Sequence, residues 1–277
     1  MTMAAARISE QRQQAADDRG SRCYRSPVDT TESITFSATG GLRLAGLLHS
    51  PSGEASGLGV VVAHGMLSFK GSEKHRAFCE AAAEIGAVAL RFDFRGRGES
   101  DGDPHDLTVS NEVEDMAAAI AFLRNRDVDR IALVGSSLGG TVALLTAAAD
   151  RDIAGLVTIA APARLPDRPR EAWGGNGQTG DDGLVEVAPD ERIHRRFFSD
   201  AARHDPVAAA SSIRCPWLII HGGLDATVPP VDAHRFADAA PGAVVELRPN
   251  ANHRFDDPPE RRWLVSRVAD HIAGLHY

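Results

Sequence analysis

Two adjacent serines lie between glycines in the stretch GSSLGG, residues 135–140, which joins an apolar run to a helical pattern. A nucleophile on a sharp turn from strand to helix needs very small residues two positions before and two positions after it, because the chain packs against itself there. Ser137 meets this condition, since Gly135 and Gly139 flank it. Ser136 has larger side chains at both positions. The spacing therefore predicts Ser137 as a nucleophile.

A serine hydroxyl becomes an effective nucleophile when a base accepts its proton, and the base needs a carboxylate that orients it. In a sheet with alternating strands and helices, the chain order serine, acid, histidine is expected, each group following a strand end. Asp225 follows the apolar run 216–222, and His253 follows the run 243–249. The sequence thus predicts Ser137, Asp225 and His253 as a catalytic triad.

The other histidines are weaker candidates for the base. His221 ends the strand before Asp225 and is expected to point into the sheet edge, and His64 is expected to stabilise a turn. The remaining competitors fall in an irregular segment, in expected helices or at the C-terminus: His194, His204, His234, His271 and His276.

A negatively charged transition state needs N–H donors that are already in place. One expected donor is the backbone N–H of Leu138, at the start of the helix after the serine. The other is the backbone N–H of Met66, in the loop AHGMLSF that follows the run 58–63. Met66 and Leu138 are therefore the predicted oxyanion hole.

The elements that must position these residues alternate between strands and helices. A hairpin is expected around Gly40 and Gly41, and Ser72 and Ser110 are expected helix N-caps. The pattern predicts an α/β fold with a mostly parallel sheet and helices on both faces, whose functional loops follow the carboxyl ends of the strands. The expected strands span 58–65, 88–94, 130–136, 152–161, 216–222 and 243–249, and the helices 72–87, 106–126, 138–150, 231–240 and 259–275.

One region interrupts the alternation. Residues 163 to about 204 are rich in proline, glycine and charge, and they carry Trp173, Phe197 and Phe198 in polar surroundings. A connection of this length between two core strands is usually functional or irregular. We interpret it as a small lid insertion, with a solvated surface insertion as the alternative.

Composition narrows the class of protein. The chain has 277 residues, a formal net charge of −8 and 5% aromatic residues, which argues against a nucleic-acid partner. It has no apolar run long enough for a membrane span. Three cysteines without a CxxC spacing suggest no metal site and no disulfide framework, and a cytoplasmic location is expected. Residues 1–28 are expected to form a mobile polar extension before one domain at 29–277.

Together the motifs AHGM, RFDFRGRGESDG, GSSLGG, HGGLDATVP and NANHRF resemble those of the α/β-hydrolase superfamily, over about residues 30–277. Within it the chain resembles serine-aminopeptidase-like hydrolases, and in its motifs the cinnamoyl or feruloyl esterases. The resemblance implies an α/β-hydrolase fold with a leading β-hairpin and the same triad and oxyanion donors. It also implies that Asp93 and Arg95 form a pair that braces their loop.

The implied activity is that of a serine hydrolase, which cleaves small acyl or aryl carboxylic esters through an acyl-enzyme intermediate. Neither an organic cofactor nor a metal is required, and the partner is a small-molecule ester; the oligomeric state stays open. One alternative is an aminopeptidase-like amide hydrolase, in which Asp181, Asp182 and Glu186 would hold a free amino terminus. The other is a catalytically silent binding protein on the same fold.

Overall fold

The computed structural model describes residues 30–166, 180–188 and 191–276. The predicted N-terminal extension, residues 1–28, lies outside the described residues, and so do Cys23 and Trp173.

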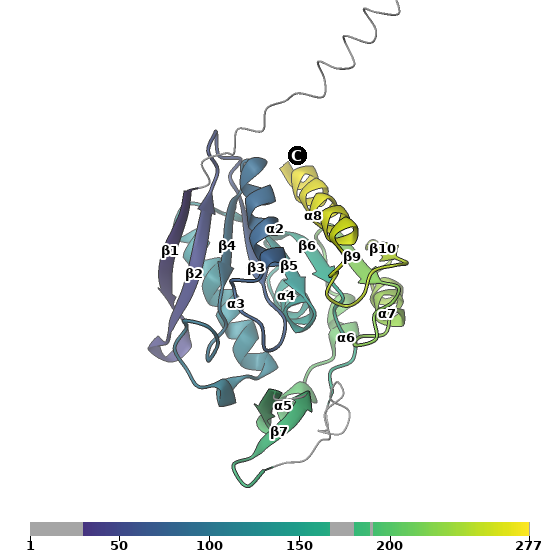
Figure 1. The fold of residues 1–277 in the computed structure, drawn as a ribbon. Helices are drawn as coiled ribbons and strands as arrows, with labels where there is room; N and C mark the ends of the chain where they lie inside the picture. The colour runs from purple at the N-terminus through teal and green to yellow at the C-terminus, as the bar shows by residue number, and fades with distance from the viewer. Residues whose placement is uncertain (1–29, 167–179, 189–190, 277) are drawn as a thin grey trace, which may run out of the picture.

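An eight-stranded sheet forms the centre of the fold, in the order β1-β2-β4-β3-β5-β6-β9-β10 (Figure 1). The pairs β1–β2 and β2–β4 are antiparallel, and every pairing from β4 to β10 is parallel. The inner strands are apolar along their whole length, as strands covered on both faces should be. The strands are β1 (Thr30–Ser37), β2 (Arg43–Ser50), β3 (Leu58–Ala63), β4 (Val88–Phe92), β5 (Arg130–Ser136), β6 (Ile153–Ile159), β9 (Trp217–Gly222) and β10 (Val244–Arg248).

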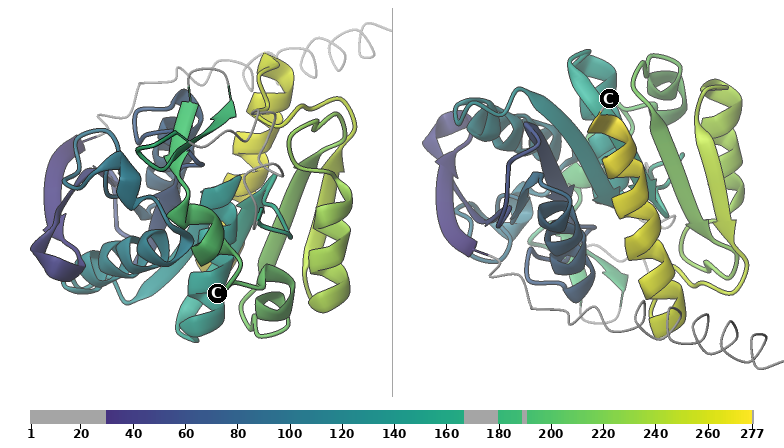
Figure 2. Two further views of the ribbon diagram at one scale, coloured as in Figure 1. Left: turned by 90° about the horizontal axis from the view of Figure 1, so that it is seen from below. Right: turned by 90° about the horizontal axis from the view of Figure 1, so that it is seen from above.

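Helices cover both faces of the sheet (Figure 2). On one face α2 (Glu73–Glu84) packs beside α8 (Pro258–Ala273), and Phe78 and Val268 share a buried apolar cluster there. On the other face, Met116 and Val142 belong to the larger core cluster. The helices of that second face are α3 (Val109–Arg124), α4 (Leu138–Ala149) and α7 (Val231–Ala239), with the short α6 (Pro206–Ala210) between α4 and α7.

The expected α/β architecture is confirmed, including the leading hairpin. Gly40 and Gly41 both have φ of +78° in the turn between β1 and β2, a conformation that glycine adopts without strain. The predicted N-cap of α3 is wrong by two residues. Thr108 occupies that position and accepts the Asn111 N–H at 3.1 Å, whereas Ser110 bonds to Asp200.

The irregular segment contains a hairpin and a helix that periodicity did not predict. Strands β7 (Leu184–Ala188) and β8 (Glu191–His194) pair antiparallel, and α5 (Arg196–Ala201) follows them. These elements stand beyond one end of the main sheet (Figure 1). Phe197 and Phe198 are buried in the main core rather than lying in polar surroundings, because α5 packs against α3.

In the part of the chain that the structure describes, no helix is long and apolar enough to cross a bilayer.

The first turn of α3 contains a buried carboxyl group. Glu112 is 1% exposed, and neither of its carboxyl oxygens has a hydrogen-bond partner among the described residues. Burial, followed by the negative charge of Asp115, raises the pKa of Glu112 well above its ordinary value. The folded protein therefore keeps this carboxyl protonated at pH values where the unfolded chain has released the proton.

We predict that Glu112→Gln stabilises the protein at pH 7. The unfolded state gains free energy by ionising Glu112 as the pH rises above about 4.3, and this gain disappears in the variant. The midpoint of thermal unfolding should rise at pH 7 by about 2–4 °C for each kcal/mol recovered, and change less at pH 4. Glu84→Gln, on the exposed face of α2, is the matched control. Equal shifts at both pH values would contradict a protonated Glu112.

Candidate active site

Ser137 lies at a strained turn between β5 and α4. Its φ of +53° and ψ of −127° are unfavourable for a residue with a side chain, by about 1–3 kcal/mol. The surrounding backbone holds this conformation. The Ser137 N–H donates to the Ile159 carbonyl at 2.8 Å, and the N–H groups of Gly140 and Thr141 donate to the Ser137 carbonyl.

The flanking glycines are required by close backbone contacts. A Cβ atom at Gly135 would overlap the Gly139 carbonyl, and a Cβ atom at Gly139 would overlap the His64 carbonyl. Strand β5, helix α4 and the loop after β3 therefore meet at this turn. The small-residue rule from the sequence has its physical basis in these contacts.

The three side chains of the predicted triad are hydrogen-bonded in series. His253 Nε2 lies 3.1 Å from Ser137 Oγ, and His253 Nδ1 lies 2.8 Å from Asp225 Oδ2. The carboxylate accepts only, so Nδ1 carries the proton of this contact and Nε2 can accept the serine proton. The residues come from the turns after β5, β9 and β10, at one edge of the sheet.

The Asp225 side chain is fully buried, and its carboxylate has four contacts with possible donors. The N–H groups of Thr227 and Val228 donate to Oδ1, each at 2.8 Å, while His253 and His221 contact Oδ2. Burial raises the pKa of Asp225, but the hydrogen bonds from His221, His253 and Val228 outweigh it and hold the pKa well below the ordinary range. Asp225 therefore stays ionised whenever the protein is folded near neutral pH.

His221 is a site residue that the sequence did not identify. It was expected to point into the sheet edge, but its Nε2 lies 3.2 Å from Asp225 Oδ2 and 3.0 Å from the Val228 carbonyl. The signal that could have found it is its place at the end of β9, four residues before Asp225. A tight turn there brings the two side chains together.

Both predicted oxyanion donors lie in backbone segments that converge on Ser137. Leu138 is the first residue of α4, where N–H groups have no acceptor within the helix. Met66 follows Gly65, and a Cβ atom at Gly65 would lie only 3.1 Å from Ser137 Cβ. The loop that carries Met66 thus runs directly alongside the serine.

His64 stabilises this loop, as expected. Its Nδ1 contacts the Gly65 carbonyl at 2.9 Å, and its Nε2 accepts the Phe94 N–H at 3.2 Å. Burial lowers the pKa of His64 to about 4, so the ring is neutral at pH 7. A neutral ring with Nδ1 protonated satisfies both contacts.

The expected pairing of Asp93 with Arg95 is wrong, although both side chains brace the loops around the site. Asp93 is fully buried and accepts from the Lys70 N–H and the Lys70 ammonium, each at 2.6 Å. Arg95 instead forms a two-pronged contact with Asp115 on α3, at 2.9 and 2.7 Å. The two residues are separated by Phe94 in the motif, and each takes its partner from another part of the chain.

A third side chain of the same motif contacts the loop that carries Met66. Arg97 donates to the Leu67 carbonyl at 2.6 Å and to the Ser68 carbonyl at 3.3 Å. Leu67 has φ of +58°, an unfavourable value for leucine, directly after Met66. These hydrogen bonds hold the strained segment in place.

The remaining expected competitors lie away from the triad contacts. His204 contacts Ser110 and Asp200, and His194 contacts Arg196. His234 and His271 lie within helices, as expected. Within residues 30–166, 180–188 and 191–276, no group of three or more His, Cys, Asp or Glu side chains could hold a metal ion.

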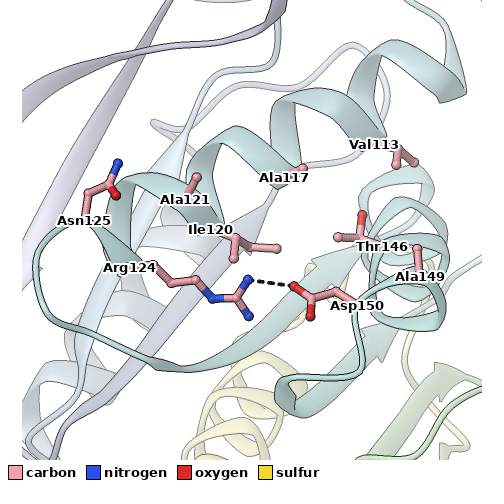
Figure 3. A pocket seen from close by; sticks show the side chains of 9 residues that line it. All are labelled: Val113, Ala117, Ile120, Ala121, Arg124, Asn125, Thr146, Ala149 and Asp150. Carbon is pink, nitrogen blue, oxygen red and sulfur yellow. Dashed lines mark hydrogen bonds and ion pairs between the residues drawn. The ribbon is translucent and has the colours of Figure 1, made fainter.

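A separate hollow of about 380 Å³ lies between α3 and α4 (Figure 3). Ile120, Ala117 and Ala149 line it, and Arg124 bonds to Asp150 across it at 2.9 Å. None of the predicted site residues lines this hollow. It sits beside the helices, not at the edge where the triad side chains meet.

The chain belongs to the α/β hydrolase family, whose model matches residues 60–262. The match includes all three residues of the predicted triad. The sequence-based assignment to this superfamily is confirmed.

The chain is also similar to relatives in sequence and to solved structures in fold. The mitochondrial palmitoyl-protein thioesterase ABHD10 of Homo sapiens is 27% identical over 78% of this chain and 74% of its own. Est1E from Butyrivibrio proteoclasticus, solved with ferulic acid bound, matches with a TM-score of 0.77 at 21% identity, over 86% of this chain and 96% of its own. The mouse α/beta hydrolase domain-containing protein 10 matches with a TM-score of 0.71 at 24% identity, over 88% and 99%.

We predict that Gly139→Ala damages the turn at Ser137. The added methyl group would overlap backbone that cannot move independently, and overpacking of this kind costs about 1–3 kcal/mol. The midpoint of thermal unfolding should fall and hydrolytic activity should be lost. Gly53→Ala is the control, because a Cβ atom there meets nothing within 4 Å. Normal stability and activity in Gly139→Ala would contradict the close packing of the turn.

Proposed function

We propose that the protein is a serine hydrolase that cleaves carboxylic esters through an acyl-enzyme intermediate, with small acyl or aryl esters as substrates. The observation that carries the proposal is the continuous series of hydrogen bonds from Asp225 through His253 to Ser137. Membership of the α/β hydrolase family supports the proposal. So do the human relative, which is named a thioesterase, and the structural neighbour Est1E, which was solved with ferulic acid bound.

In the first half of the reaction, His253 Nε2 accepts the hydroxyl proton as Ser137 Oγ attacks the ester carbonyl carbon. The carbonyl oxygen becomes an oxyanion and accepts hydrogen bonds from the N–H groups of Met66 and Leu138. The carbon–oxygen bond to the alcohol then breaks, and the alcohol leaves with the proton from His253. The buried charge of Asp225 stabilises the transient imidazolium.

In the second half, a water molecule replaces the alcohol. His253 accepts a proton from the water as the water oxygen attacks the acyl carbon. The bond to Ser137 Oγ breaks, and Ser137 takes back its proton from His253. The acid product leaves and the free enzyme is restored. None of these steps uses a metal or an organic cofactor.

The aminopeptidase alternative has less support. Asp181 and Asp182 are exposed in the turn before β7, and one oxygen of Asp182 accepts the Leu184 N–H at 2.9 Å. An amino-terminus site needs carboxylates that converge on the nucleophile. The silent-protein alternative is disfavoured because the strained turn at Ser137 has a cost that catalysis explains.

We predict that Ser137→Ala lowers kcat for p-nitrophenyl butyrate by about four to six orders of magnitude, because the triad acts as a unit. The variant should keep the unfolding midpoint of the wild type and should not react with a fluorophosphonate probe. Ser136→Ala is the matched control and should retain activity within a few-fold.

The same assay should compare p-nitrophenyl esters of increasing acyl length, a feruloyl ester, an acyl thioester and an aminoacyl anilide. Ester hydrolysis that depends on Ser137 is the expected result. Preference for the thioester would move the substrate class toward that of the human relative, and preference for the anilide would favour the aminopeptidase. Undiminished ester hydrolysis in Ser137→Ala would overturn the proposed function.

We also propose that residues 163 to about 204 act as a lid. Its described part is anchored to α3 through Asp200, whose carboxylate accepts the Ser110 N–H at 2.9 Å and the Ser110 hydroxyl at 2.7 Å. Arg196 adds a weaker ion pair to Asp106 at 3.5 Å. The cytoplasmic location stays a prediction, and the human relative is named as mitochondrial.

We predict that Asp200→Asn changes substrate selection more than chemistry, because a neutral amide cannot accept both Ser110 hydrogen bonds as strongly. KM for long acyl esters should change at least about threefold, while kcat for the acetyl ester stays within about twofold. Asp181→Asn, exposed in the same segment, should behave like the wild type. Unchanged selectivity across the ester series would identify the segment as a surface insertion.

A further inference from the structure

A second histidine contacts the proposed catalytic acid. His221 is 1% exposed, and its Nε2 lies 3.2 Å from Asp225 Oδ2, the same oxygen that His253 Nδ1 approaches at 2.8 Å. It also lies 3.0 Å from the Val228 carbonyl. Both neighbours of Nε2 accept hydrogen bonds, so Nε2 must carry a proton and share it between them.

The other ring nitrogen of His221 gives the contact its significance. Nδ1 is buried and has no hydrogen-bond partner among the described residues. An unpartnered buried nitrogen is unfavourable, and an apolar side chain would avoid it. What a histidine supplies here and an apolar residue cannot is the Nε2–H donor to Asp225.

We propose that His221 is a positioning residue, which fixes the Asp225 carboxylate against His253 and moderates its charge. The inference rests on the proposed function. The N–H groups of Thr227 and Val228 hold Oδ1 at 2.8 Å, and His221 Nε2 contacts the other oxygen, Oδ2, at 3.2 Å. Because both oxygens accept hydrogen bonds, rotation of the carboxylate is restricted. Oδ2 therefore stays within hydrogen-bond distance of His253 Nδ1.

The shared oxygen also links His221 to the acid–base behaviour of His253. A donor on Oδ2 withdraws charge from the atom that stabilises the His253 imidazolium. Without this donor, Oδ2 is more negative toward His253, and the imidazolium is favoured to higher pH. Lys74 on α2 is a further charged group that interacts with Asp225, and substitution at His221 does not change it.

The test compares His221→Leu with His221→Gln, because the glutamine amide can put an N–H donor near the position of Nε2. With p-nitrophenyl butyrate, His221→Leu should lower kcat at least about tenfold and leave KM within about twofold. The acid limb of the pH profile of kcat/KM should move to higher pH by about half a unit or more. His221→Gln should keep kcat within about threefold and restore the acid limb.

His49→Leu is the control for loss of a buried histidine from the same sheet, since His49 on β2 bonds to Arg91 and not to the triad. It should leave the acid limb in place. Rates are taken below the unfolding midpoint of each variant, and His221→Met replaces His221→Leu if the latter does not fold. Two results would overturn the positioning role. One is a Leu or Met variant with the acid limb and kcat of the wild type. The other is a Gln variant that loses as much kcat as the Leu or Met variant.

Failure of this inference differs from failure of the proposed function. If Ser137→Ala and Asp225→Asn lose activity while His221→Leu keeps the wild-type profile, only the role of His221 is wrong. If Ser137→Ala keeps its activity, the triad itself is wrong.

Discussion

The close packing of backbone around Ser137 is the constraint on which the candidate site depends. Strand β5, helix α4 and the loop after β3 approach so closely that the neighbouring backbone leaves no room for a Cβ atom at position 135 or 139, and both residues are glycine. This packing holds Ser137 at a positive φ, and in this conformation its hydroxyl lies 3.1 Å from His253 Nε2. It also brings the loop that carries Met66 beside the serine. One contact region therefore sets both the nucleophile and the expected oxyanion donors.

Buried ion pairs hold the loops that this packing requires. The Asp93 carboxylate accepts hydrogen bonds from the backbone N–H and the ammonium of Lys70. Arg95, at the start of its loop, donates to Asp115 on α3. Breaking such a pair by removing one partner costs about 3–5 kcal/mol, because a buried charge is left alone. Arg97 adds a hydrogen bond to the carbonyl of Leu67, the strained residue after Met66. The motif RFDFRGRGES thus contributes to the site through its neighbours rather than by touching the triad.

The acid of the candidate triad illustrates how burial and hydrogen bonding oppose each other. Burial alone would favour a protonated Asp225, yet donors on both oxygens keep it ionised. Glu112, also buried but without a hydrogen-bond partner among the described residues, has the opposite outcome and stays protonated. The contrast arises from the donors, since both carboxyl groups are removed from water. Ionisation at this edge of the sheet is a property of the contacts that tertiary folding provides.

The sequence by itself determined the order of the elements and the identity of Ser137, Asp225 and His253 as candidates. Periodicity, small residues at the turn and the positions of strand ends are local signals. They depend on residues that are neighbours in the chain, and folding leaves these neighbours together. The partners of Asp93, Arg95 and His221, and the hairpin β7–β8, were decided only by the tertiary structure. A buried polar side chain takes whichever donor or acceptor folding brings near. Its partner therefore depends on residues distant in the chain, which no spacing in the sequence specifies.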